Sequence, residues 1–137
     1  MNDITDKILT MGPYADFGII DNFDKSRDYS EYKNGETYQD KVKEHNCVKI
    51  TDNIINFWWN SLTAMKSYFH CFDRPATALA RWGVTLIPPE SLGVFYNIIE
   101  NDTPVEFFDK YAEVVTRLLN LVERAKHENK FVIHYGV

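Results

Sequence analysis

The sequence predicts a mainly α fold, a compact helical bundle that forms a single domain over residues 1–137. Three stretches support this prediction: residues 103–127, 52–70 and 89–100. In each stretch apolar residues recur three and four positions apart, which gives a helix one buried face. The last two of these helices in the chain are separated only by Asn101–Asp102, so we expect neighbouring helices to pack nearly antiparallel.

The longest predicted helix runs from Thr103 to His127. Thr103 is expected to cap it, Pro104 suits the first helical position, and Glu106 completes a T-x-x-E capping box. A helix of this length is about 36 Å long, because each residue adds about 1.5 Å. We therefore expect it to cross the domain and to form the spine against which the other helices pack.

The beginning of the chain is less regular. A short helix is predicted to begin at Asn2 or Asp3 and to end at Gly12–Pro13. The apolar run at residues 14–20 is either an extended segment or a second short helix. Asn34–Gly35 favours a type I′ turn, so its surroundings form either a short hairpin or a surface loop.

The remaining elements follow from turn and capping signals. Residues 47–50 are a short strand or lead into the helix at 52–70. A short helix is predicted over 73–83, because Gly83 suits a helix end. Residues 84–87 are expected to form an extended linker before Pro88, and residues 130–135 a C-terminal strand.

The charge balance limits the classes of partner. The chain has 20 acidic and 15 basic residues, a net charge of -5, which argues against direct binding to nucleic acid or to an anionic membrane. No stretch is long and apolar enough to span a membrane, and Asp3 and Asp6 stand where a signal peptide would carry positive charge. We therefore expect a cytoplasmic protein.

No pattern in the sequence predicts catalysis. His45, Cys47, His70 and Cys71 lack the spacing of a zinc site, and Walker, Rossmann, nucleophile-elbow and EF-hand motifs are absent from the sequence. We expect no metal, no cofactor and no catalytic residue, and hence no enzyme.

The most suggestive stretch for function is acidic and aromatic. Carboxylates attract a cationic surface over a distance, and aromatic rings anchor it on contact. The alternative is a solvated segment whose tyrosines fold back onto the domain. The predicted partner-binding residues are Asp21, Phe23, Asp24, Asp28, Tyr29, Glu31, Tyr32, Glu36, Tyr38 and Asp40.

In its size, acidity, acidic-aromatic segment and lack of catalytic motifs, the chain resembles the small immunity proteins that bacteria pair with polymorphic or contact-delivered toxins. The resemblance implies a cytoplasmic inhibitor that binds and neutralises a cognate protein toxin, such as a nuclease. Because the inhibitor is acidic, the toxin is expected to be basic.

Two other functions are compatible with the sequence. The first is a small-ligand-binding protein or enzyme with a pocket between the 52–70 helix and the 80–92 segment. The second is a homodimeric helical regulator, since the oligomeric state does not follow from sequence. Trp58 and Trp59 are adjacent, so at least one is expected in the core while the other is a candidate interface anchor.

Overall fold

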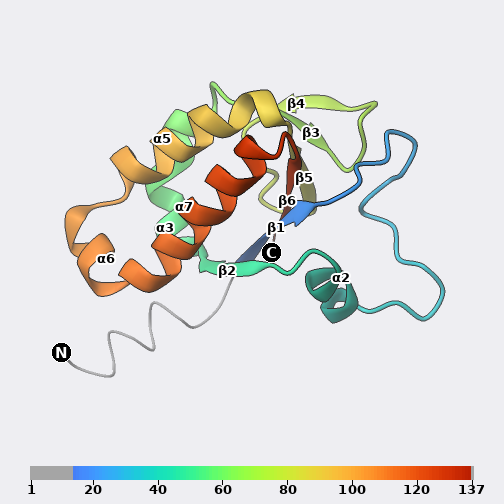
Figure 1. The fold of residues 1–137 in the computed structure, drawn as a ribbon, viewed down its shortest axis with the longest axis horizontal. Helices are drawn as coiled ribbons and strands as arrows, with labels where there is room; N and C mark the ends of the chain where they lie inside the picture. Colours follow the sequence, from blue (N-terminus) through green and yellow to red (C-terminus); the bar gives the residue numbers. More distant parts are fainter. Residues whose placement is uncertain (1–13, 137) are drawn as a thin grey trace.

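A six-stranded antiparallel sheet dominates the computed structural model, which describes residues 14–136 (Figure 1). The mainly α, helical-bundle prediction is therefore wrong, and the fold is a mixed α/β fold. The spatial order of the strands is β2-β1-β6-β5-β3-β4. The strands are β1 (Tyr14–Ile20), β2 (Val48–Thr51), β3 (Lys66–Phe69), β4 (Pro75–Thr77), β5 (Val84–Ile87) and β6 (Phe131–Tyr135).

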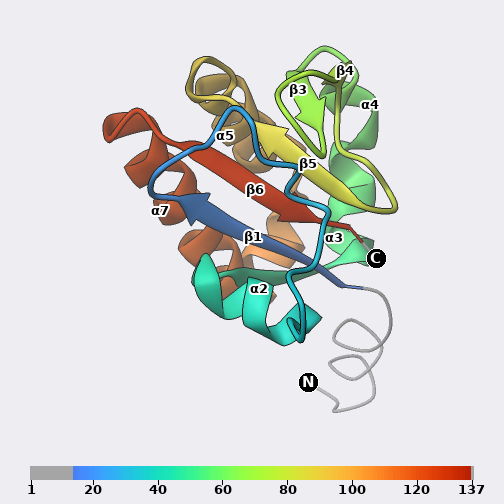
Figure 2. The same cartoon turned by 90° about the vertical axis from the view of Figure 1, so that its right-hand side faces the viewer.

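Helices cover one face of this sheet, with α5 and α7 lying against each other over the central strands (Figure 1). Among the helices of residues 14–136, only α2 lies on the other face, beside the long connection that follows β1 (Figure 2). The helical elements are α2 (Tyr38–Glu44), α3 (Asp52–Ile55), η1 (Asn56–Trp58), α4 (Trp59–Leu62), η2 (Pro89–Ser91), α5 (Leu92–Asp102), α6 (Val105–Lys110) and α7 (Ala112–His127).

The central strands are buried on both faces. On β1, Ala15, Phe17 and Ile19 belong to the core beneath the helices, whereas Ile20 belongs to a second core on the opposite face. The second core is completed by Tyr29 from the long connection and by alternate residues of β5 and β6. Each central strand therefore needs apolar side chains on both sides, which removes the alternation that marks a half-buried strand.

Residues 21–47 cover the second face (Figure 2). This segment approaches β1 so closely that a Cβ on Gly18 would lie 2.6 Å from the carbonyl oxygen of His45 and 2.8 Å from Sγ of Cys47. No side chain fits in that space. The glycine in β1 is therefore what allows the segment to pack directly on the strand.

The predicted helix over residues 52–70 is only partly correct. Helical structure covers α3, η1 and α4 and ends at Leu62, after which the chain forms β3. β3 pairs with β4 and with β5, which come later in the sequence. The spacing of Met65 and Phe69 also fits a helix. It gives no information on the hydrogen bonds that stabilise β3, because those bonds are made with strands elsewhere in the chain.

Two further predictions on this side of the sheet are wrong. Residues 75–77, inside the predicted 73–83 helix, form β4. Residues 84–87 are not a linker but the strand β5, which lies between β6 and β3. Pro88 restricts the residue before it to extended geometry, and that geometry suits the end of a strand equally well.

The predicted 103–127 helix consists of two helices, α6 and α7, that meet at Tyr111. The predicted capping box is absent, because Pro104 is the N-cap of α6. The Thr103 hydroxyl instead donates to the carbonyl oxygen of Ile99 at 2.6 Å and accepts a hydrogen bond from Nε1 of Trp58 at 2.9 Å. Thr103 thus links α5 to the core.

Other predictions are confirmed. The helix predicted from residue 89 is present as η2 and α5, and the C-terminal strand is present as β6. The extended alternative holds for residues 14–20 and the strand alternative for 47–50. The surroundings of Asn34–Gly35 form a loop. The predicted short helix that ends at Gly12–Pro13 lies outside the described residues.

His134, on β6, is a buried histidine that contacts Phe17 of the core beneath the helices. Its ring is 2% exposed, lies 3.2 Å from the Thr85 hydroxyl through Nδ1, and contacts the Phe17 ring. Burial lowers the pKa of His134 to about 3 from its ordinary value of 6.5, because a charged imidazolium would be desolvated there. The unfolded chain therefore binds a proton between these two values that the folded chain does not.

We expect the free energy of unfolding to fall as the pH is lowered from 6.5 to 5, by up to about 1.4 kcal/mol per pH unit from this residue. The measurement is urea unfolding at pH 7, 6 and 5 for the wild type and for His134→Gln. The variant should show a smaller pH dependence, with the rest coming from groups such as His45, whose pKa burial also lowers. Equal pH slopes in the two proteins would contradict this assignment.

Candidate functional site

Two of the aromatic residues predicted to bind a partner fold back onto the sheet. Tyr29 is 1% exposed, and the ring of Phe23 stacks on it and on Phe131, with centroid distances of 5.6 and 3.7 Å. Tyr29 also receives the guanidinium of Arg27 over its ring at 4.4 Å. These rings attach the 21–47 segment to the sheet; Tyr29 is buried and Phe23 remains partly exposed.

Most of the predicted carboxylates organise the backbone of the same segment. Asp24 accepts hydrogen bonds from the backbone and hydroxyl of Ser26, and Asp28 accepts the same pair from Ser30. Asp40 forms a capping box with Thr37 at the start of α2. Because hydrogen bonds favour the ionised form, the pKa values of the three carboxyl groups are lowered.

The remaining carboxylates of the set also lie along this loop. Glu36 accepts a hydrogen bond from the backbone of Lys33 at 3.0 Å, and Asp21 pairs with Lys130 at 3.0 Å. Glu31 is exposed. The acidic residues are thus largely the means by which an irregular segment holds its shape, and they still present their charges at the surface.

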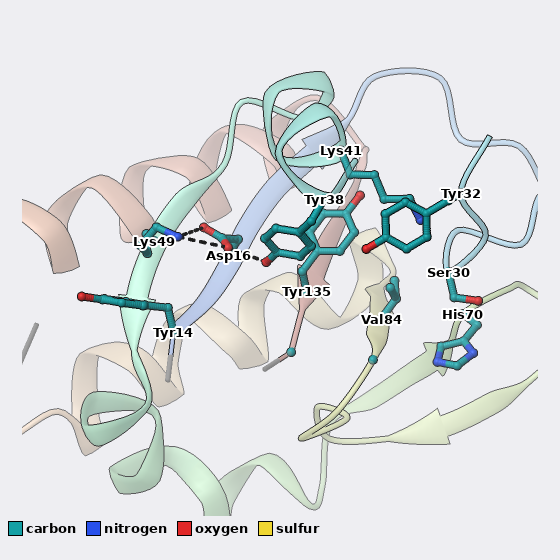
Figure 3. Close-up of a pocket in the computed structure, with 12 residues that line it drawn as sticks. Tyr14, Asp16, Ser30, Tyr32, Tyr38, Lys41, Lys49, His70, Val84 and Tyr135 are labelled. Atoms are coloured by element: carbon teal, nitrogen blue, oxygen red, sulfur yellow. Dashed lines mark hydrogen bonds and ion pairs between the residues drawn. The ribbon is translucent and has the colours of Figure 1, made fainter. Parts of the chain in front are cut away.

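Tyr32 and Tyr38, the other two predicted aromatic residues, border a cavity of about 610 Å³ between the 21–47 segment and the sheet. We call this cavity the tyrosine pocket (Figure 3). It differs in position from the pocket expected between the 52–70 helix and the 80–92 segment, although three of its residues come from those ranges. Its lining residues are Tyr14, Asp16, Ser30, Tyr32, Tyr38, Lys41, Lys49, His70, Gly83, Val84, Tyr135 and Gly136.

Asp16 is a buried carboxylate on β1 within an otherwise apolar strand. It is 1% exposed, and its Oδ2 accepts a hydrogen bond from the Tyr38 hydroxyl at 2.5 Å. Lys49 on β2 places its Nζ 3.4 Å from Oδ1 (Figure 3). Oδ1 nevertheless has no hydrogen-bond partner. Desolvation, and then the hydrogen bond to Asp16, raise the pKa of Tyr38, so its hydroxyl stays protonated and donates.

A buried lysine lies on the other side of the pocket. Lys41 of α2 is 1% exposed, and its Nζ donates to the carbonyl oxygen of Tyr29 at 2.9 Å. The same nitrogen lies 4.1 Å from the ring centroid of Tyr32, whose face attracts a cation. Desolvation lowers the pKa of Lys41, because the charged ammonium form is less favourable away from water.

Tyr135 stands between these two groups, at the end of β6 (Figure 3). Its ring meets the Tyr38 ring edge to face at 5.7 Å, and its buried hydroxyl has no hydrogen-bond partner. Desolvation raises the pKa of Tyr135, so the hydroxyl is a neutral donor. Two buried polar atoms, this hydroxyl and Oδ1 of Asp16, thus remain unsatisfied in the lining of one cavity.

The far end of the pocket depends on tightly packed backbone. His70 and Gly83 both have positive φ angles, 67° and 104°, and a Cβ on Gly83 would lie 2.7 Å from Nε2 of His70. The backbone amide of Gly136 donates to the carbonyl oxygen of Gly83 at 2.6 Å. These contacts fix the β4–β5 connection against the end of β6.

Trp82 lies in that connection, next to Gly83, and its side chain is 71% exposed. The preceding Arg81 is fixed by an ion pair with Asp52 at 3.0 Å and lies over the Trp59 ring at 4.6 Å. Trp58 is fully buried and Trp59 partly so, which confirms that one of the adjacent pair is in the core. The most exposed tryptophan is therefore Trp82, which the sequence placed inside a helix.

Sequence reasoning identified two of the pocket residues as functional candidates and missed the charged ones. Asp16 carried a signal, because it is the lone charge in the apolar run at residues 14–20. Lys41 and Lys49 carried none, since exposed lysines are common and only the fold brings these two to the cavity. Within residues 14–136, no cluster of three His, Cys, Asp or Glu side chains could hold a metal ion.

Comparisons with known proteins found no matching family and no significant similarity to a curated protein or a solved structure. No helix among the described residues has the length and hydrophobicity needed to cross a membrane.

Proposed function

We propose that this chain is an inhibitor of the immunity-protein type, which binds a basic protein toxin in the cytoplasm and blocks it. The proposed contact surface consists of the outer side of the 21–40 segment and the loop that carries Trp82. The observation that carries the proposal is the exposure of Trp82, at 71% of its side chain, on a loop whose neighbours are fixed.

An exposed tryptophan places a large apolar ring in water, which is unfavourable unless a partner covers it. Tryptophan is enriched among the residues that contribute most to protein–protein affinity, because its large ring buries much area with few rotamers to lose. Arg81 is held by Asp52 on one side, and Gly83 packs against His70 on the other. Little backbone conformational entropy of this loop would therefore be lost when Trp82 binds.

The charge of the neighbouring segment favours a basic partner. Asp21, Asp24, Glu31 and Asp40 are exposed, and the chain has a net charge of -5. Such a surface accelerates encounter with a cationic protein and disfavours anionic ones. Tyr32, whose side chain is 53% exposed, adds a second aromatic contact at the rim of the tyrosine pocket.

The test is binding to the protein encoded by the neighbouring reading frame, purified as an inactive variant and measured by calorimetry at low and high salt. Trp82→Ala should weaken binding by at least about 30-fold, since a central tryptophan contributes about 2 kcal/mol or more. The free energy of unfolding of the Trp82→Ala variant should differ from that of the wild type by no more than about 0.5 kcal/mol. Raising the salt concentration should weaken binding of the wild type.

Val105→Ala is the matched control, because Val105 is 72% exposed but lies on α6, on the helical side of the sheet (Figure 1). It should bind like the wild type. Binding that is equally strong in Trp82→Ala would remove Trp82 from the interface. Absence of binding at low salt would contradict the proposed function for this partner.

A further inference from the structure

We propose that the tyrosine pocket is a binding site for a small planar organic anion, such as an aromatic carboxylate. This proposal does not rest on the inhibitor function, since it concerns the cavity beneath the 21–47 segment and shares with the proposed contact surface only Tyr32 at its rim. A cavity of about 610 Å³ lies within the range of small-molecule sites. Its four tyrosine rings offer flat, apolar surfaces against which a planar ligand can stack.

The charge inside the pocket selects for an anion. Asp16, Lys41 and Lys49 are the lining residues with charged side chains, and together they carry one net positive charge. The charge of Asp16 is balanced by Lys49 at 3.4 Å and by the hydroxyl of Tyr38. Lys41 has no described carboxylate within ion-pair distance, and Glu36, Asp28 and Glu44 act on its charge only from farther away.

Lys41 is also incompletely hydrogen-bonded. An ammonium group has three donors. One is used by the carbonyl oxygen of Tyr29, and the ammonium group also lies over the face of the Tyr32 ring. The remaining donor is buried, at 1% exposure of the residue, in a place where a charge without a close partner is costly. A ligand carboxylate would supply both the counter-charge and the acceptor.

Other donors in the lining support the same choice. The buried hydroxyl of Tyr135 has no partner and can donate to a second ligand oxygen. At the far end, a guanidinium nitrogen of Arg74 lies 3.1 Å from Nδ1 of His70. Because a guanidinium only donates, Nδ1 accepts and Nε2 carries a proton. The one carboxylate among the described lining residues, Asp16, lacks a hydrogen bond at Oδ1, but its charge is already balanced by Lys49. A cationic ligand would meet the net positive charge of the pocket, so the pocket disfavours it.

The test uses three probes of nearly the same shape: 2-naphthoate, 2-naphthamide and 2-naphthylmethylammonium. Each is titrated into the isolated chain by calorimetry and by two-dimensional amide NMR. We expect 2-naphthoate to bind saturably, with shifts at the amides of Gly83, Tyr135 and Gly136. The neutral amide should bind at least about tenfold more weakly and the ammonium probe more weakly still, because a charged hydrogen bond is lost and then repulsion is added.

Variants then locate the charge. Lys41→Met keeps the length of the side chain and should reduce the affinity for 2-naphthoate at least about tenfold, while narrowing the difference between the anionic and neutral probes. Lys43→Met, on the exposed side of the same helix, is the matched control and should bind like the wild type. Tyr135→Phe removes only the unpaired hydroxyl, and should weaken binding of the carboxylate more than binding of the amide.

Three results would overturn the proposal. The first is that the ammonium probe binds as tightly as 2-naphthoate. The second is that a folded Lys41→Met, or Tyr135→Phe if the first variant does not fold, keeps full affinity and full preference for the anion. The third is that no probe binds at millimolar concentration. None of these outcomes bears on the Trp82 surface, so the two proposals fail separately.

Discussion

Replacing Trp58 with alanine is expected to lower the free energy of unfolding by about 3–5 kcal/mol. Trp58 is fully buried at the junction of the helices and β1, with the rings of Phe17 and Phe95 at centroid distances of 6.5 and 5.9 Å. The truncation opens a large cavity in this core. It also removes the donor that Nε1 supplies to the Thr103 hydroxyl.

Chemical denaturation followed by far-ultraviolet circular dichroism measures this effect without relying on tryptophan fluorescence. Trp59→Ala is the matched control, because Trp59 is only partly buried and lies at the margin of the same core. The loss in the control should be clearly smaller. A loss of less than about 1 kcal/mol for Trp58→Ala would show that this ring does not occupy the centre of the core.

Leu118→Ala is expected to lower the free energy of unfolding by about 2–5 kcal/mol. Leu118 is fully buried on the side of α7 that packs against α5 and the sheet, so the lost methyl groups leave a cavity between elements held in place by the rest of the core. The size of the effect depends on how far the neighbouring side chains can move into that space.

Asn120→Ala in the same helix provides the control for Leu118→Ala. Asn120 is exposed, so the change should alter stability by no more than about 0.5 kcal/mol. Urea unfolding of the two variants under the same conditions gives the comparison. If Leu118→Ala left the free energy of unfolding unchanged, α7 would not be a core helix. That result would contradict both its apolar stripe and its packing in the fold.

The acidic-aromatic segment shows how far a functional hypothesis from sequence can reach. Tyr32 and Tyr38 do lie at a cavity, but Phe23 and Tyr29 attach the segment to the sheet. A sequence of alternating carboxylates and rings does not distinguish a binding surface from a covering layer. In both cases the carboxylates face water and the rings face an apolar surface. Only the fold shows whether that apolar surface belongs to a partner or to the protein's own sheet.

The charged residues of the tyrosine pocket could not be predicted together. Asp16 is on β1, Lys41 on α2 and Lys49 on β2, and they share a cavity because β1 pairs with β2 while α2 packs on the same face. Trp82 was missed for a related reason. It follows Arg81, whose ion pair with Asp52 joins residues far apart in the chain, so no local pattern indicates how this loop is placed.

The sequence by itself determined the helices whose stability is local. The apolar stripe of α7 and the helix start at Pro89 each depend on residues close together in the sequence. The structure contains both. The strand at the end of the chain was also identified, because Phe131 to Tyr135 is rich in β-branched and aromatic residues.

Only the tertiary structure decided that the domain is built on a sheet. A strand is stabilised by partners that lie elsewhere in the chain, and β5 gains its hydrogen bonds from β3 and β6. Because layers cover both faces, β1 and β5 lack the alternation that would have identified them as strands. The same long-range pairing, which no local pattern records, brings the residues of the tyrosine pocket together.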